Sequence, residues 1–296
     1  MSVSQNILYK YFPIDSKFTN NLRVAFSIKR ELNDPFELLP SHNALNKAME
    51  SNTLYQPVFS IFESEQELLE PKKMIKDIND PNFGCPIFHH YGIFCLSGKR
   101  DNILMWSHYA SNHTGFVIGF DANHPFFNQN LNDSCFTKAI GNVEKVEYKQ
   151  DKRRATSSAF ESWFLQKAKD WEYEDEYRMI LPVKNADRIM FKAEMDDWGK
   201  VIKEARFATD EERRLLAENN YIGEGFIPLF SVPESAIVSL TLGAQCDLSK
   251  QLDLVDYFSA FNPELEVGRM SIASDTFELE YSQLHSFGHM KIETLS

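Results

Sequence analysis

Residues 171–181 have the sequence Trp-Glu-Tyr-Glu-Asp-Glu-Tyr-Arg-Met-Ile-Leu, a dense block of carboxylates that passes into an aliphatic run. This pattern predicts a β-strand that the chain enters from a helix. In an extended segment, side chains alternate between two faces, so Glu174, Glu176 and Arg178 would share one face. Two carboxylates about 7 Å apart beside a guanidinium are costly to desolvate, which favours a site that uses them. The other interpretation is a solvated edge strand that carries a ladder of salt bridges.

The composition is that of a soluble globular protein, because 43% of the 296 residues are hydrophobic and 25% are charged. This length is sufficient for a sizeable core, and we expect one α+β domain over residues 1–296. The formal net charge of -12 argues against a broad phosphate-binding surface, since sequence-independent nucleic-acid binding needs clustered Lys and Arg. A local basic cluster is nevertheless present at Lys149, Lys152, Arg153 and Arg154.

The sequence shows no pattern for targeting or for metal binding. Residues 1–6 lack the basic and apolar regions of a signal peptide, and no apolar run approaches the length of a membrane span. We therefore expect a cytoplasmic protein that does not enter a membrane. The four cysteines have no CxxC spacing and are expected to be free thiols. His108 and His113 are five residues apart and do not align on a helix, so no metal site is indicated.

Hydrophobic patterning predicts a mixed α+β chain, because helices separate some strands and not others. Strands are expected at residues 7–12, 22–27, 91–97, 116–121, 143–148 and 236–242, in the aliphatic run before residue 182, and between residues 265 and 281. Helices are expected at residues 103–110, 151–170 and 248–262, with helical elaborations at about 41–80 and 186–220. Neither GxGxxG nor GxxxxGK[ST] occurs, so no Rossmann or P-loop nucleotide site is indicated.

Two short segments carry further candidate site residues. Asn33-Asp34-Pro35 is typical of a turn, and two interpretations are open: a polar loop before a helix, or a loop that presents Asn33, Asp34 and Glu37 to a ligand. The helix at 103–110 has Asp101 or Asn102 as its expected cap.

Within the helix at 103–110, His108 alone is most simply a core or surface histidine. Beside Tyr109 and near His113, in a strand–helix–turn–strand unit, it becomes a candidate for a pocket wall.

The combined motifs resemble a bacterial and phage-associated family, the one called domain of unknown function 2971. The resemblance covers about residues 7–182, with a weaker strand end at Leu240–Gly243. The motifs are Leu8-Tyr9-Lys10-Tyr11, Asn33-Asp34-Pro35-Phe36-Glu37, Phe94-Cys95-Leu96-Ser97, Met105-Trp106-Ser107-His108-Tyr109-Ala110, Gly115-Phe116 and Trp171 to Arg178.

This layout in turn resembles the ADP-ribosyltransferase fold, in which NAD lies across a split mixed or antiparallel β-sheet. The resemblance implies that Glu176 is the catalytic carboxylate, which steadies the oxocarbenium ion that forms from NAD. It implies that Glu174 orients the acceptor. The chain lacks an early His or Arg and a Ser-Thr-Ser strand, which are common in such transferases.

The same resemblance implies how the remaining candidates would bind NAD. Tyr9 or Tyr11 would be the early-strand residue and Ser97 the hydroxyl at the sheet mouth. Arg23 or Arg178 would bind the pyrophosphate, and aromatic residues would supply a stacking wall. The candidate NAD-binding residues are Tyr9, Tyr11, Arg23, Asn33, Asp34, Ser97, Trp106, His108, Tyr109 and Arg178.

Three functions are compatible with these patterns. The first is an NAD-consuming transferase or glycohydrolase in bacterial defence or a toxin system, with a protein or nucleic acid as acceptor and an antitoxin as partner. The second is a non-catalytic module that binds a nucleotide or another ligand, which the missing early His or Arg favours. The third is a metal-dependent phosphodiesterase or nuclease that uses the carboxylates Asp34, Glu37, Glu174 and Glu176 with His108.

Overall fold

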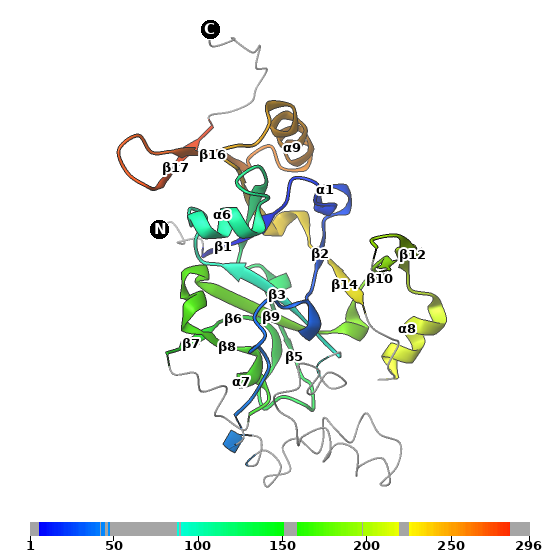
Figure 1. Ribbon diagram of the computed structural model, residues 1–296. Helices are drawn as coiled ribbons and strands as arrows, with labels where there is room; N and C mark the ends of the chain where they lie inside the picture. The colour runs from blue at the N-terminus through cyan, green and yellow to red at the C-terminus, as the bar shows by residue number, and fades with distance from the viewer. Residues whose placement is uncertain are drawn as a thin grey trace, which may run out of the picture. The chain divides into compact units, whose positions relative to one another are not determined.

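The computed structural model describes residues 6–41, 43, 44, 47, 88, 90–150, 159–196, 198–218 and 225–284. Its secondary structure is mixed α+β, which confirms the predicted fold class (Figure 1). The chain divides into two compact units. Unit 1 comprises Met1–Leu22, Leu96–His124 and Pro233–Ser296, and unit 2 comprises Arg23–Cys95 and Pro125–Val232.

Unit 1 is built on a mostly antiparallel sheet. Its strands are β1 (Ile7–Phe12), β4 (Phe116–Asp121), β15 (Ile237–Leu242), β16 (Glu266–Ile272) and β17 (Leu279–Gln283). Their order across the sheet is β17-β16-β15-β4-β1. Only the β15–β16 pair is parallel among these described strands. A parallel pair needs a crossover, which helix α9 (Leu248–Phe261) supplies here.

Aromatic rings form the core of unit 1. The ring of Phe12 on β1 stacks on Phe18 at 4.7 Å and on Phe116 of β4 at 5.3 Å, and Phe258 of α9 lies beside Phe116. The shorter helices of this unit are α1 (Phe18–Asn21), α6 (Ile103–Tyr109) and the 3-10 turn η5 (Glu234–Ala236). Packing of α1 and α9 through these rings therefore stabilises the sheet.

Unit 2 contains part of a nine-stranded sheet, a separate four-stranded sheet and two small strand pairs. The part of the first sheet that lies in this unit has the order β3-β9-β6-β5 and the second sheet the order β13-β10-β14-β2, while β7 pairs with β8 and β11 with β12. The strands are β2 (Arg23–Ala25), β3 (Tyr91–Ser97), β5 (Asn128–Leu131), β6 (Ile140–Lys145), β7 (Glu147–Lys149), β8 (Gln166–Ala168), β9 (Glu176–Pro182), β10 (Arg188–Phe191), β11 (Glu194–Met195), β12 (Val201–Lys203), β13 (Arg206–Phe207) and β14 (Phe226–Ser231). The last two residues of β3 belong to unit 1.

Short helices connect the strands of unit 2. They are α7 (Glu161–Phe164), α8 (Asp210–Ala217) and the 3-10 turns η1 (Lys29–Glu31), η2 (Pro125–Phe127), η3 (Lys169–Glu174) and η4 (Val183–Asn185). The core beneath the first sheet is aromatic, with Tyr91, Phe136, Phe160 and Phe164 in mutual ring contact.

The predicted helix at 151–170 is wrong over its described part. Only residues 161–164 are α-helical, and β8 pairs with β7 in place of a continuing helix. The buried side chains that gave the segment its helical periodicity belong partly to a short helix and partly to a strand. Residues 151–158 lie outside the described residues.

The predicted helical elaboration at 186–220 is also largely wrong. Its first part forms β10, β11, β12 and β13, and the helix is confined to α8. Arg188–Phe191 pairs with β14, so tertiary pairing overrides the charged, helix-like composition of the segment. The elaboration predicted at 41–80 falls outside the described residues, apart from residues 41, 43, 44 and 47.

Within the described ranges, no helix combines the length and the apolar character that crossing a membrane requires. The cysteines at 95, 135 and 246 are free thiols, as predicted, and Cys85 lies outside the described residues.

Candidate functional site

The strand β9 begins at Glu176, two residues later than an extended Glu174 would require. The turn η3 ends at Glu174, and Asp175 adopts the left-handed conformation with a φ of 45°. Asp tolerates this conformation better than most residues because its short side chain can bond locally. The expectation that Glu174 lies on the strand is therefore wrong, whereas Glu176 and Arg178 share one strand face as predicted.

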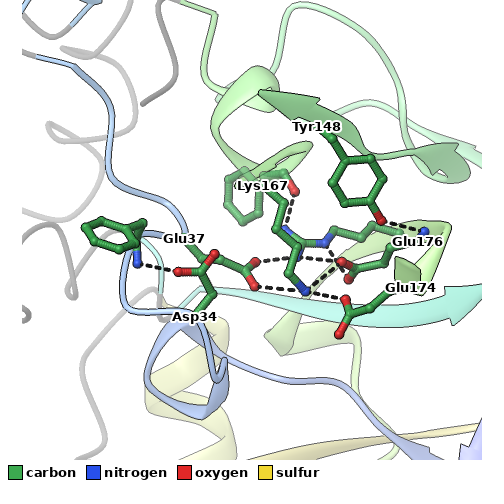
Figure 2. Close-up of polar contacts among 9 residues, drawn as sticks. Asp34, Glu37, Tyr148, Lys167, Glu174 and Glu176 are labelled. Atoms are coloured by element: carbon green, nitrogen blue, oxygen red, sulfur yellow. Dashed lines mark hydrogen bonds and ion pairs between the residues drawn. The ribbon is translucent and has the colours of Figure 1, made fainter. Parts of the chain in front are cut away.

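Arg178 is the centre of a polar cluster in unit 2, and its side chain is fully buried. Its Nε donates to Glu176 Oε1 at 2.8 Å and its Nη2 to Glu176 Oε2 at 3.1 Å. The same Nη2 donates to Glu37 Oε2, and Nη1 donates to the carbonyl oxygen of Phe164 at 2.8 Å (Figure 2). Such bidentate, charge-assisted bonds fix the geometry of both carboxylates.

Lys167 on β8 supplies the second cation. Its Nζ donates to Glu174 Oε2 at 2.5 Å and to Glu176 Oε2 at 2.9 Å, and it lies 3.4 Å from Glu37 Oε1. Figure 2 shows Lys167 directed at these acidic side chains. Strand pairing positions it, because Lys167 lies opposite Tyr148 of β7, whose hydroxyl oxygen accepts a bond from the Glu176 backbone N–H at 2.8 Å.

The buried cluster is thus Glu37, Lys167, Glu174, Glu176 and Arg178. Each of these side chains is at most 4% exposed. Three carboxylates face two cations, so the cluster holds one carboxylate in excess of its positive charges. Because charges in a low-dielectric interior are costly, removing either cation would leave buried carboxylates uncompensated.

The pKa values of Glu37 and Glu176, which both contact Arg178, are shifted in opposite directions. Burial acts to raise the pKa of Glu176, but Arg178 and Lys167 outweigh it and lower that pKa to about 2. Burial raises the pKa of Glu37, and the same two cations offset only part of this effect. Burial alone would lower the pKa of Arg178 and Lys167, yet the surrounding carboxylates hold both values above their ordinary range. Both cations and Glu176 are therefore charged at neutral pH.

Several acceptors at and near this cluster lack a bond. Glu37 Oε1, Asp34 Oδ2 and Gln166 Oε1 are buried and have no hydrogen-bond partner among the described residues. Asp34 uses its other oxygen, which accepts from the Phe36 N–H at 2.9 Å. A buried acceptor without a donor costs about 1–3 kcal/mol. Such atoms in a native fold call for an explanation, and a site that binds a donor-bearing ligand would supply one.

The predicted site residues of unit 2 are partly brought together. Glu174, Glu176 and Arg178 belong to the buried cluster, and Asp34 is buried on the same turn as Glu37. Asn33 is exposed on that turn, and Arg23 is half-buried on β2 opposite Ser231 of the second sheet. Asn33 and Arg23 are therefore not members of the buried cluster.

The predicted site residues of unit 1 surround the loop after β3. Tyr11 donates its hydroxyl to the Lys99 carbonyl oxygen at 2.8 Å, and Trp106 Nε1 donates to the Arg100 carbonyl oxygen at 2.7 Å. The two rings meet edge to face at 5.4 Å. Ser97 Oγ accepts from the Lys99 N–H at 3.1 Å. These contacts hold the loop against β1.

The other unit 1 candidates lie at the margins of this loop. Tyr9 pairs with Ser97 across the strands and lies 5.9 Å from the guanidinium of Arg100. His108 is exposed on α6 and Tyr109 is half-buried beside it. The predicted catalytic carboxylates thus belong to unit 2, and the predicted aromatic residues belong to unit 1.

Sequence patterns missed Lys167 as a site residue and left the role of Glu37 open. One signal for Lys167 was present: it is a cation among the large apolar residues Phe164 and Trp171. Its ammonium lies 4.9 Å from the Trp171 ring centroid. In the part of the chain that the structure describes, no group of three or more His, Cys, Asp or Glu side chains is arranged to hold a metal ion.

The fold and the cluster define a mixed α+β protein with a buried carboxylate–cation centre. Residues 105–179 match the family described as protein of unknown function (DUF2971), so the chain carries a region of the family that its motifs predicted. The matched region includes Lys167, Glu174, Glu176 and Arg178, whereas Glu37 precedes it. No curated protein and no solved structure matches the chain.

Proposed function

We propose that the protein is an NAD-consuming enzyme of the ADP-ribosyltransferase kind, either a transferase or an NAD glycohydrolase, with Glu176 as its catalytic carboxylate. The observation that carries this proposal is the state of Glu176: it is buried, held ionised, and fixed by Arg178 and Lys167. Cleavage of the nicotinamide–ribose bond develops positive charge at the anomeric carbon. A fixed anion provides preorganised stabilisation of that charge.

The chemistry of the remaining donors and acceptors fits the nicotinamide ribose of NAD. This part of NAD carries a positive charge and two hydroxyl donors. The cluster has an excess carboxylate, and Asp34 Oδ2 and Glu37 Oε1 are buried acceptors without a hydrogen-bond partner among the described residues. Within the proposal, these two oxygen atoms bind the nicotinamide ribose. Glu174, which is held by a hydrogen bond from Lys167, orients the acceptor.

The proposal is tested by incubating the protein with labelled NAD and with protein or nucleic-acid acceptors. We expect nicotinamide release by the wild type and a loss of about 100-fold or more in Glu176→Gln, since one electrostatic contact to a transition state is worth that much. Glu161→Gln is the matched control, because Glu161 is a buried glutamate of unit 2 that bonds Thr137 outside the cluster. Equal release by the wild type and Glu176→Gln, or release by neither, contradicts the proposal.

A second candidate is a module that binds a nucleotide without turnover. The observation that favours it is the occupancy of both Glu176 oxygens, which accept from Arg178 and Lys167. This function would appear as a rise in the thermal unfolding midpoint with NAD or ADP-ribose, because ligands that bind only the folded state stabilise it. Stabilisation without nicotinamide release identifies the binding module, and release identifies the enzyme.

The setting of the activity follows from the phage-associated family that the motifs resemble. Within the proposal, the enzyme modifies a macromolecule of a bacterial host or depletes its NAD, in defence or as a toxin. Such an activity requires a neutralising partner in the cell that makes the protein.

A further inference from the structure

Glu37 differs from the other carboxylates of the cluster in how its oxygens are used. Its Oε2 accepts from Arg178, whereas its Oε1 has no hydrogen-bond partner among the described residues. The Lys167 ammonium is 3.4 Å from Oε1, but no hydrogen bond forms between them. Glu176 in contrast accepts through both oxygens. Glu37 therefore keeps one oxygen to which no described group donates a hydrogen bond, whereas each oxygen of Glu176 accepts at least one.

The position of Glu37 is fixed by its own turn and by Arg178. The Glu37 N–H donates to the Asp34 carbonyl oxygen at 3.2 Å, which closes the turn after Asn33-Asp34-Pro35. Arg178 contacts Glu37 and Glu176 with one guanidinium, so the two carboxylates are held side by side. A group that is fixed next to a reacting centre gains rate because its orientation is already established.

The charged groups that face Glu37 are Arg178, Lys167 and Glu176, and Asp34 lies on the same turn. Burial raises the pKa of Glu37 while Arg178 and Lys167 hold the pKa of Glu176 at about 2. Two neighbouring carboxylates with pKa values moved apart are suited to different roles. The one with the raised pKa is the better proton acceptor, and the one with the lowered pKa remains an anion.

We propose, on the basis of the proposed function, that Glu37 is the general base of the reaction and takes the proton of the acceptor hydroxyl or water on its Oε1. The O–H bond of the acceptor breaks, and its oxygen forms the new bond to the anomeric carbon. The bond from that carbon to nicotinamide breaks, and nicotinamide leaves as a neutral molecule with the electron pair. Glu37 then releases the proton to solvent, so one NAD and one acceptor yield one product, one nicotinamide and one proton.

The test measures kcat, KM for NAD and the pH–rate profile of the full chain and of Glu37→Gln. We expect kcat to fall about 100- to 10,000-fold, as is typical for the loss of a general base. The wild-type rate should rise with pH through the raised pKa of Glu37, and Glu37→Gln should lack this acidic limb. Formate should partly restore the rate of Glu37→Ala, because a small carboxylate can occupy the vacated position. Glu161→Gln should retain the wild-type kcat and profile.

The outcomes separate the two proposals. A wild-type protein that releases no nicotinamide overturns the proposed function, and the role of Glu37 falls with it. An active wild type with an unchanged kcat and acidic limb in Glu37→Gln overturns only the role of Glu37. If Glu37→Gln does not fold, as judged by circular dichroism, the wild-type profile decides. A rate that is independent of pH above the ordinary glutamate pKa of 4.5 then overturns the role of Glu37.

Discussion

At the scale of single residues, the cluster shows how one guanidinium makes two buried carboxylates tolerable. Arg178 satisfies Glu37, Glu176 and the carbonyl oxygen of Phe164, all away from solvent. Together with Lys167, it offsets the desolvation of Glu176 and part of the desolvation of Glu37. The same bonds fix the orientation of Glu176, so the residue that stabilises the fold also positions the proposed catalytic carboxylate.

We therefore expect Arg178→Met to destabilise the protein by about 3–5 kcal/mol, because it leaves Glu37 and Glu176 buried without their shared cation. The free energy of unfolding, measured by urea denaturation at neutral pH, checks this value. The control is Arg206→Gln, which removes an exposed arginine whose partner is Glu212. The control should leave the urea midpoint unchanged, and an equally stable Arg178→Met would show that the cluster has no structural role.

At the scale of elements, local signals set where helix α6 begins. Asn102 Oδ1 accepts from the N–H groups of Leu104 at 2.9 Å and Met105 at 3.1 Å, so it is the cap of α6. The sequence left Asp101 and Asn102 as alternatives. The cap also fixes Trp106, which enters the core and donates to the Arg100 carbonyl oxygen.

Asn102→Ala should lower the stability of the protein by about 1 kcal/mol, since the two N–H groups lose their acceptor. Asn102→Asp should retain most of the stability because Asp caps helices equally well. Thermal unfolding followed by circular dichroism measures both variants. A midpoint of Asn102→Ala equal to that of Asn102→Asp would contradict the capping role.

At the scale of the whole molecule, charge limits the range of partners. The formal net charge is -12, and the described carboxylates at the buried cluster are accompanied by many more on exposed elements such as α8. A long polyanion gains affinity by releasing counterions to clustered Lys and Arg. The basic cluster of Lys149, Lys152, Arg153 and Arg154 has Lys149 on β7, while its other members lie outside the described residues.

We expect no measurable binding of random-sequence duplex DNA at physiological salt, with any dissociation constant weaker than about 100 μM. Fluorescence anisotropy with a labelled duplex, repeated over a range of salt concentrations, tests this. Tight binding with a steep salt dependence would contradict the expectation. Replacing Lys149, Lys152, Arg153 and Arg154 with Ser would then show whether the basic cluster is responsible.

Sequence patterns were sufficient for elements whose own residues carry the signal. The runs at β1, β3, β4 and β15 are continuous or alternating apolar segments, and they form strands close to where they were predicted. The helix α9 likewise follows its periodicity. In contrast, β8 and β10 are strands because β7 and β14 pair with them, and pairing with a distant segment leaves no local pattern.

The sequence by itself determined the α+β class, the family and the shared face of Glu176 and Arg178, and it narrowed the cap of α6 to two residues, because each depends on near neighbours in the chain. Only the tertiary structure decided that Glu37 and Lys167 complete the cluster. Arg178 meets Glu37 across 141 positions of sequence, and a contact over that separation depends on how the strands pair. The tertiary structure also decided the charge state of the carboxylates. Burial and the two cations hold Glu176 as an anion and leave the pKa of Glu37 raised.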